Sequence, residues 1–177
     1  MSRCTRCHLH KTRVSQVPGR GFVPCDILVI DAAPGKAEDV TGRGFGGPAF
    51  RLFDRAMGEA VSISRTHEPR VHYTYMVQCK PCDTRGGAWR APSPAEVDFC
   101  SVNLLETFTK VQPKFVIYLS AEVRRLCEPR FSVRGVTVPH PEFILRRGGT
   151  ECAEYRVMRA TLEQLVEKLE QERNWRK

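Results

Sequence analysis

Closely spaced cysteines are the residues of this sequence best suited to chemistry. Cys4 and Cys7 form a C-x-x-C pair, Cys79 and Cys82 form another in "QCKPC", and the chain holds eight cysteines in all. In a reducing compartment such thiols favour metal ligation over disulfides, and four thiolates suit either a zinc ion or an iron-sulfur cluster. Three isolated cysteines fit buried apolar positions better than ligand positions: Cys25, Cys127 and Cys152.

A Pro-Gly turn is the second candidate for chemistry. The stretch "DAAPG", residues 31–35, directly follows the apolar run "ILVI" of residues 27–30. A glycine after a proline lets backbone N–H groups approach a ligand, and ligands of α/β proteins bind at the carboxyl ends of strands. A plain strand-to-helix turn is the alternative. Further irregular stretches follow predicted strands or their first turns, and all could line one cleft with this turn: residues 41–48, 82–92 and 138–149.

The elements that must position these residues alternate between strands and helices. Four apolar runs predict strands, at residues 26–30, 73–77, 115–119 and 135–139. Continuous apolar runs are typical of parallel strands covered on both faces. Helical patterns begin at Pro48, at Ser93, where "SPAE" reads as a capping box, and at Ala121, and a final amphipathic helix is expected at about 152–172. The sequence therefore predicts the α/β class.

Composition limits the kind of protein. The 177 residues, 41% of them hydrophobic, suffice for the core of one ordinary domain. A net charge of +8 favours an anionic partner such as nucleic acid. No apolar run approaches the roughly 20 residues of a membrane span, and the first residues lack the apolar centre of a signal peptide. We therefore expect a cytoplasmic monomer that binds no membrane.

The order of these motifs resembles the iron-sulfur (family 4) uracil-DNA glycosylases. The shared series is a C-x-x-C pair, a strand with an A-P-G turn, "ED", "GRGFGGPAFRLF", "QCKP", a later cysteine, "FVIYL" and "HPEFILR". It runs from Cys4 to about Arg146. The resemblance implies a three-layer α/β/α sandwich with a central four-stranded parallel sheet, formed by a single domain over residues 1–177 with an N-terminal cysteine arm at 1–24. It also implies DNA with a flipped base as the partner.

The resemblance implies a [4Fe–4S] cluster as the cofactor. Its ligands in this sequence would be Cys4, Cys7, Cys79 and Cys100. Four thiolates also suit zinc, which would use the same residues and stays the alternative. Cys82, close to Cys79, is the one rival for a ligand position. Either metal would fasten the N-terminal arm to the sheet, away from any bond that is broken.

The Pro-Gly turn departs from the family pattern. In the family, a G-E-A-P-G turn lies beside the extruded nucleotide, and its glutamate helps water attack the sugar. Here Ala32 takes the place of the glutamate, and Asp31, one residue earlier, is the only carboxylate of the motif. Successive strand residues face opposite sides, so Asp31 is either a catalytic acid or a hydrogen-bonded strand-end residue. The resemblance places the rest of the turn beside the base: Ala32, Ala33, Pro34 and Gly35.

Two aromatic residues complete the expected base site. Phe45 in "GRGF" matches the aromatic residue on which the flipped base stacks, with a core phenylalanine as the alternative. Tyr75 in "TYMVQC" stands where the family has the asparagine that pairs with the uracil edge. An amide both donates and accepts in one plane, whereas a phenol offers one hydroxyl and a bulky ring. Tyr75 and Ala32 together argue against efficient action on uracil.

The "HPEFILR" segment supplies the remaining site residues. His140 matches the histidine that stabilises negative charge on the departing base, and a loop histidine is the alternative. Ile144 and Leu145 are expected to enter the duplex, with Arg146 and Arg147 on phosphates. Three nearby acids are candidates to replace the missing glutamate: Glu38, Asp39 and Glu142.

These features support three hypotheses. The first is a DNA repair glycosylase, a hydrolase that flips uracil or another deaminated or modified pyrimidine and cleaves its N-glycosidic bond. The second is a base-modifying or group-transfer enzyme on the same scaffold, because both the acid and the base-reading amide of the family are replaced. The third is a non-catalytic DNA-binding module. The reaction product distinguishes the three. The first hypothesis predicts free base, the second an altered base still attached to its sugar, and the third no product.

Overall fold

The computed structural model describes residues 4–131, 133 and 135–175 of the chain, and its centre is a five-stranded sheet. The strands are β1 (Arg20–Gly21), β2 (Ile27–Asp31), β3 (Val71–Tyr75), β4 (Phe115–Tyr118) and β5 (Gly135–Thr137). Their order is β1-β3-β2-β4-β5, and every neighbouring pair is parallel except β1 with β3. The four parallel strands confirm the expected sheet.

The sheet has five strands rather than the four predicted, and the additional one is the edge strand β1. This strand consists of Arg20 and Gly21, both exposed, and it pairs antiparallel with Tyr73 and His72 of β3. Two exposed residues without an apolar run carry no strand pattern in the sequence. The pairing matters for the site because it fixes the end of the N-terminal arm against β3.

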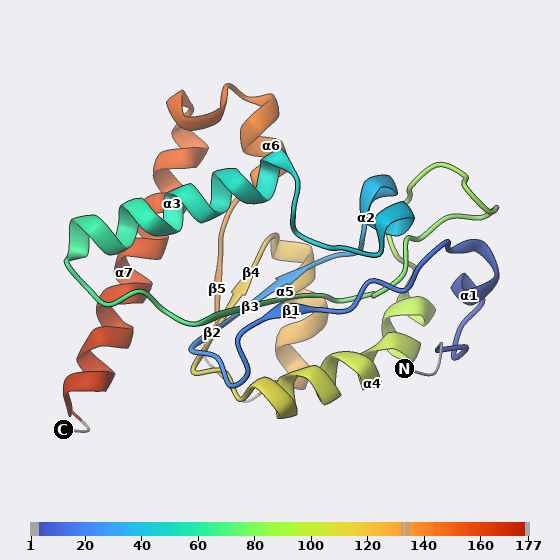
Figure 1. Ribbon diagram of the computed structural model, residues 1–177, viewed down its shortest axis with the longest axis horizontal. Helices are drawn as coiled ribbons and strands as arrows, with labels where there is room; N and C mark the ends of the chain where they lie inside the picture. Colours follow the sequence, from blue (N-terminus) through green and yellow to red (C-terminus); the bar gives the residue numbers. More distant parts are fainter. Residues whose placement is uncertain (1–3, 132, 134, 176–177) are drawn as a thin grey trace.

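Helices cover both faces of the sheet (Figure 1). The longest are α3 (Pro48–Ser64), α4 (Pro94–Val111) and α7 (Ala153–Trp175). The shorter helices are α1 (Leu9–Thr12), α2 (Lys36–Thr41), α5 (Ala121–Cys127) and α6 (Pro141–Arg146), and two 3-10 turns follow α5 and α6, at Glu128–Arg130 and Gly149–Glu151. None of the described helices is long and apolar enough to span a bilayer.

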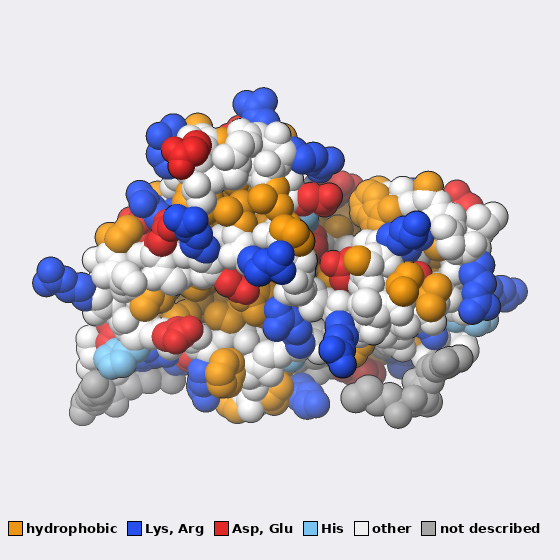
Figure 2. All heavy atoms as spheres, turned by 45° about the horizontal axis from the view of Figure 1, so that its top comes forward, with side chains coloured by type: hydrophobic (Ala, Val, Ile, Leu, Met, Phe, Trp, Pro, Cys, Tyr) orange, Lys and Arg blue, Asp and Glu red, His pale blue; other side chains and the backbone are white. Residues whose placement is uncertain are grey.

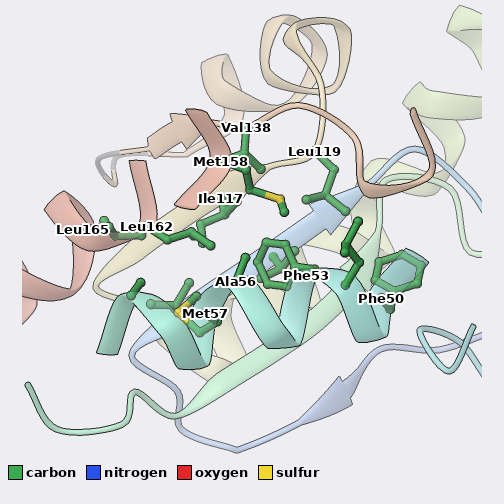
Figure 3. Packing of buried hydrophobic residues seen from close by; sticks show 14 of the residues in the cluster. Phe50, Phe53, Ala56, Met57, Ile117, Leu119, Val138, Met158, Leu162 and Leu165 are labelled. Carbon is green, nitrogen blue, oxygen red and sulfur yellow. The ribbon is translucent and has the colours of Figure 1, made fainter. Parts of the chain in front are cut away.

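Two apolar clusters on opposite faces of the sheet hold the layers together. The first joins α3, α7 and the sheet, where Phe53 and Met57 meet Leu162 and Leu165 (Figure 3). The second joins α4 and α5 to the other face, with Leu28 and Ile30 of β2 contributing to it. Neighbouring residues of β2 thus enter opposite clusters, which explains why the whole strand is apolar and buried until Asp31.

Helix ends follow their sequence signals closely. Ser93 caps α4 through a complete capping box with Glu96, as the "SPAE" motif predicts. The final helix runs to Trp175, three residues past the expected end at about 172. Its apolar stripe against α3 extends to Leu169, and beyond it Arg173 pairs with the buried Asp26 at 2.9 Å.

Candidate active site and cysteine cluster

Asp31 and His140, both expected to take part in chemistry, lie together at the carboxyl edge of the sheet. Asp31 is the last residue of β2, the central strand, and His140 is the N-cap of α6, just past β5. His140 Nε2 lies 3.1 Å from Asp31 Oδ1, and the same oxygen accepts a 2.7 Å hydrogen bond from the Ala32 N–H. A residue 109 positions away in the chain therefore meets the strand end. The pair occupies the ligand-binding edge of a parallel α/β sheet.

Backbone contacts define the state of the His140 ring. The Glu142 N–H donates a 3.1 Å hydrogen bond to Nδ1, so the neutral ring carries its proton on Nε2, toward Asp31. Burial by itself lowers the pKa of His140, but the hydrogen bond and charge of Asp31 outweigh burial and raise it. The ring is partly buried, and Asp31 is 7% exposed. The carboxylate thus orients the imidazole and directs its Nε2–H toward the strand end.

The three candidate replacement acids have different surroundings. Asp39 is buried and accepts hydrogen bonds from the Val14 and Ser15 N–H groups, so it holds the N-terminal arm. Glu142 is exposed in the first turn of α6. Glu38 is half-buried, and its Oε2 lies only 2.9 Å from where a Cβ on Gly35 would stand. Glu38 therefore lies over the Pro-Gly turn.

Tyr75 occupies the place next to Phe45 where a flipped base was expected to stack. The two rings lie parallel, with centroids 4.2 Å apart and an interplanar angle of 18°. Each side chain is 1% exposed, and among the described residues the Tyr75 hydroxyl makes no hydrogen bond of regular geometry. Phe45 sits at φ 61°, and Gly44 beside it leaves no room for a Cβ, which would meet the Tyr75 ring at 2.9 Å. A base can therefore stack on Phe45 only if Tyr75 moves.

The rest of the turn is packed against neighbouring segments. Ala33 and Pro34 are buried, and Ala33 belongs to the apolar cluster on the α4 side. The Asp31 and Ala32 carbonyls accept from the Met76 and Val77 N–H groups. On the face shown in Figure 2, acidic and histidine side chains gather about a hollow between α6 and α2, with basic side chains around it.

The expectation that Ile144 enters the duplex was wrong. Ile144 is fully buried in the core, because on the short helix α6 it shares the inward face with Pro141. The exposed apolar side chains are Phe143, 43% exposed and missed by the sequence reasoning, and Leu145, 38% exposed. The i, i+3 spacing of positions 141 and 144 was the signal that separates the inward from the outward residues.

Of the two arginines expected on phosphates, one is already engaged. Arg147 lies over the Phe143 ring, 5.8 Å from its centroid, and pairs with Glu154 at 3.5 Å. Arg146 is exposed at the end of α6 and makes no side-chain ion pair within the described part of the chain. Arg146 is therefore the more available of the two.

The four cysteines expected to bind metal converge where the N-terminal arm meets β3 and α4; we call Cys4, Cys7, Cys79 and Cys100 the cysteine cluster. The Asn103 Nδ2 lies 3.5 Å from the Cys100 Sγ and 3.8 Å from the Cys4 Sγ. Arg13 donates to the Cys79 Sγ at 2.9 Å. Arg13 and Asn103 are sulfur contacts that sequence reasoning missed, since neither belongs to a recognisable motif.

The thiols of the cysteine cluster lie close enough to influence one another's pKa. Burial raises the pKa of Cys7, and the neighbouring thiols of Cys100 and Cys4 raise it further. Burial likewise raises the pKa of Cys79 to about 11, although Arg13 lowers it. Within the described residues, no three potential ligands lie close enough to hold one ion. Four thiolates suit either a zinc ion or a [4Fe–4S] cluster.

Cys82, the rival ligand, is fully buried and directs its thiol to the Lys80 carbonyl at 3.6 Å. Cys25 and Cys127 are buried within the α4-side core, as expected for small apolar side chains, and Cys152 packs as a partly buried residue against the other cluster.

A parallel α/β sheet with a histidine–carboxylate pair at its carboxyl edge, and four thiols that meet where the N-terminal arm joins β3 and α4, define the class of scaffold. The uracil DNA glycosylase superfamily matches residues 18–165, and the chain belongs to this superfamily.

Curated relatives agree with this assignment. The chain is 33% identical over 117 residues to the type-4 uracil-DNA glycosylase of Saccharolobus solfataricus, covering 66% of this chain and 50% of that protein. It is 32% identical over 116 residues to the type-4 enzyme of Archaeoglobus fulgidus, covering 66% and 54%. The chain thus spans about half the length of the curated relatives it matches.

A solved structure supports the fold. The solution NMR structure of a Methanosarcina acetivorans protein assigned as a uracil DNA glycosylase superposes with a TM-score of 0.52 at 12% identity, covering 88% of this chain and 98% of that one. The expected fold is confirmed, with the added edge strand β1.

Proposed function

We propose that this chain is a DNA glycosylase that flips a deaminated or modified pyrimidine out of DNA and hydrolyses its N-glycosidic bond. The observation that supports the proposal most strongly is the Asp31–His140 pair, 3.1 Å apart at the carboxyl edge of the sheet. Membership of the superfamily and the type-4 names of the relatives agree with it. DNA is the proposed partner, bound by a cytoplasmic monomer.

His140 is suited to the leaving group. As the bond to the sugar breaks, negative charge develops on the base, and a donor held in place before the reaction stabilises that charge. The Glu142 N–H fixes Nδ1 as an acceptor, so Nε2 carries the proton to be shared with a base oxygen. When the base takes that hydrogen bond, the Asp31 carboxylate loses its ring partner and faces the reacting sugar.

Asp31 is the proposed water-positioning acid, with Glu38 as the second candidate. Asp31 alternates with Val29 along β2 and therefore faces the same side of the sheet as Phe45 and Tyr75. Ala32 packs instead against the α4-side cluster, so a side chain at position 32 lies on the face of the sheet opposite Phe45 and Tyr75. A carboxylate beside the sugar can orient water and stabilise the developing positive charge.

A second candidate function is modification of a flipped base that stays attached to its sugar. The position of Tyr75 favours it, because the ring closes the space against Phe45 and removes the planar amide that would read uracil. An altered nucleoside detected by mass spectrometry after nuclease digestion would support this function over hydrolysis.

We infer that the cysteine cluster holds a [4Fe–4S] centre. The four neighbouring thiols suit such a centre, and the resemblance to the iron-sulfur glycosylases, with the type-4 names of the relatives, favours iron over zinc. Such a centre would supply a covalent tie between the arm, the end of β3 and α4. It has no part in bond breaking in this proposal.

The test is release of free base from labelled duplexes that carry uracil, other deaminated pyrimidines or 5-substituted pyrimidines. His140→Ala should lower the rate about 10²-fold or more, since it removes the leaving-group donor. His67→Ala is the matched control, because His67 also pairs with a carboxylate, Glu170 at 2.9 Å, but lies exposed elsewhere on the surface. Absence of free base from every substrate would contradict the proposal.

A further inference from the structure

A basic groove runs beside the cysteine cluster and lies outside the active site described above. Its volume is about 1110 Å³. The groove is bordered by the N-terminal arm, which includes α1, by the loop at 82–92 and by α4. Figure 1 places α1 and that loop at the end of the molecule away from α7. The volume exceeds the roughly 300–1,000 Å³ of pockets for small ligands, and an extended chain suits it better.

The charge of the groove is strongly one-sided. Five of its lining residues are lysines or arginines, and one is an acid: Arg6, Lys11, Arg13, Arg85 and Lys110, against Glu106. Arg13 is already bound to the Cys79 sulfur, and Arg6 pairs with Glu106 at 3.7 Å. Lys11, Arg85 and Lys110 are exposed and make no ion pair among the described residues. Three cations therefore face the groove with their charge unpaired.

The floor of the groove is polar and lacks aromatic side chains among its described lining residues. Gln16 and Gln78 bond to each other at 3.0 Å, and Thr107 donates to the Asn103 carbonyl. Reading of single-stranded bases relies on aromatic stacking, which this surface does not offer. Lysine and arginine over a polar floor suit phosphate oxygens and sugars instead.

The groove connects structurally to the active site. Val14 and Ser15 line it, and their N–H groups bond to Asp39 of α2, the helix that follows the Pro-Gly turn. A Cβ on Gly42 would contact the Ser15 side chain at 3.6 Å, so the groove adjoins the 41–48 loop that carries Phe45. A nucleic acid strand at the active site can thus continue into the groove.

We propose that this groove binds the sugar–phosphate backbone of DNA flanking the flipped nucleotide, through Lys11, Arg85 and Lys110. The proposal rests on the proposed function in one respect only, that the partner is DNA. It assigns the cysteine-bearing end of the molecule a direct part in holding that partner.

The test is fluorescence anisotropy of a labelled 30-base-pair duplex with the metal-loaded protein over a range of salt concentrations. Each phosphate contact contributes about 0.9 to the slope of log K against log salt, so the triple variant Lys11→Ala, Arg85→Ala, Lys110→Ala should lower that slope by about 2 to 3. A control that removes the same charge elsewhere should leave the slope within about 0.5: Arg125→Ala, Arg156→Ala and Lys168→Ala on α5 and α7.

The conservative triple variant, Lys11→Arg, Arg85→Lys and Lys110→Arg, should keep the native slope and shows that the alanine variant acts through charge. Equal slopes for native protein and alanine variant, or an equal fall in the control, would overturn the proposal. Binding is measured without turnover. Absence of base release would therefore count against the glycosylase proposal alone. An unchanged salt slope in the alanine variant would count against the groove proposal alone, and base release at low salt would then still be expected.

Discussion

Replacement of Tyr75 tests whether its ring closes the base site. Tyr75→Asn removes a ring that is 1% exposed and stacked on Phe45, and it supplies the amide that the family resemblance implies for reading uracil. Loss of a large buried side chain costs about 3–5 kcal/mol, and removal of an unpaired buried hydroxyl returns about 1 kcal/mol or more. The free energy of unfolding should therefore fall by about 2–4 kcal/mol, measured by urea denaturation.

Uracil release should change in the opposite direction. The native protein should excise uracil slowly or not at all, and Tyr75→Asn should raise release at least about tenfold, since it opens the space on Phe45 and restores a planar donor and acceptor. Tyr75→Ala opens the same space without the amide, so it should give a smaller rise. Ala32→Glu should add little, because Ala32 packs toward the α4-side cluster.

Tyr75→Phe is the matched control for the hydroxyl. Since the hydroxyl makes no regular hydrogen bond to the described residues, its removal should leave stability unchanged or raise it by about 1 kcal/mol. A loss of more than about 1 kcal/mol would show that the hydroxyl is bonded. Fast uracil excision by native protein, or no rise with either Tyr75→Asn or Tyr75→Ala, would refute the closed-site reasoning.

Three further predictions concern charge and metal. Asp31→Asn should lower the pKa of His140, which Asp31 raises. The stabilising effect of the pair is fully present below pH about 6.5 and fades as pH rises through the elevated pKa. The stability difference between native protein and variant should therefore be larger at pH 5.5 than at pH 8.5, and an equal difference at both pH values would contradict this prediction. Burial alone would raise the pKa of Asp26, but the Arg70 N–H and Lys114 hold it at about 2. Ionised Asp26 should therefore contribute about 2 kcal/mol to the free energy of unfolding, and this contribution should be lost as pH falls from about 4 to 2. Asp26→Asn should flatten that decline in an acid-unfolding measurement. Serine at any position of the cysteine cluster should abolish visible iron-sulfur absorption, whereas Cys127→Ser should keep it; a colourless native protein with one zinc per chain would refute the assignment.

The parallel sheet and the main helices could be predicted because their signals are local. The apolar run of β2 and the capping box at Ser93 each specify an element without reference to the rest of the chain. The edge strand β1 could not, because two exposed residues become a strand only through pairing with β3. Pairing between distant segments leaves no pattern in the residues of one of them.

The candidate site shows the same division. Asp31 and His140 could be named from motifs, but whether a one-residue shift brings the acid to the histidine depends on the geometry where β2 ends. Ile144 was misplaced because a six-residue helix shows less than two turns of periodicity. The stacking of Tyr75 on Phe45 depends on a left-handed residue and on Gly44, neither of which forms a recognisable motif.

The bonds from Asp39 to the N-terminal arm have a consequence for iron supply. The arm carries two members of the cysteine cluster, and its Val14 and Ser15 N–H groups hold α2, which begins directly after the Pro-Gly turn. Release of the arm from an empty cluster would remove that anchor and leave two N–H groups and a buried carboxylate unpaired. On the proposed function, metal content would then influence the order of the Pro-Gly turn at a distance.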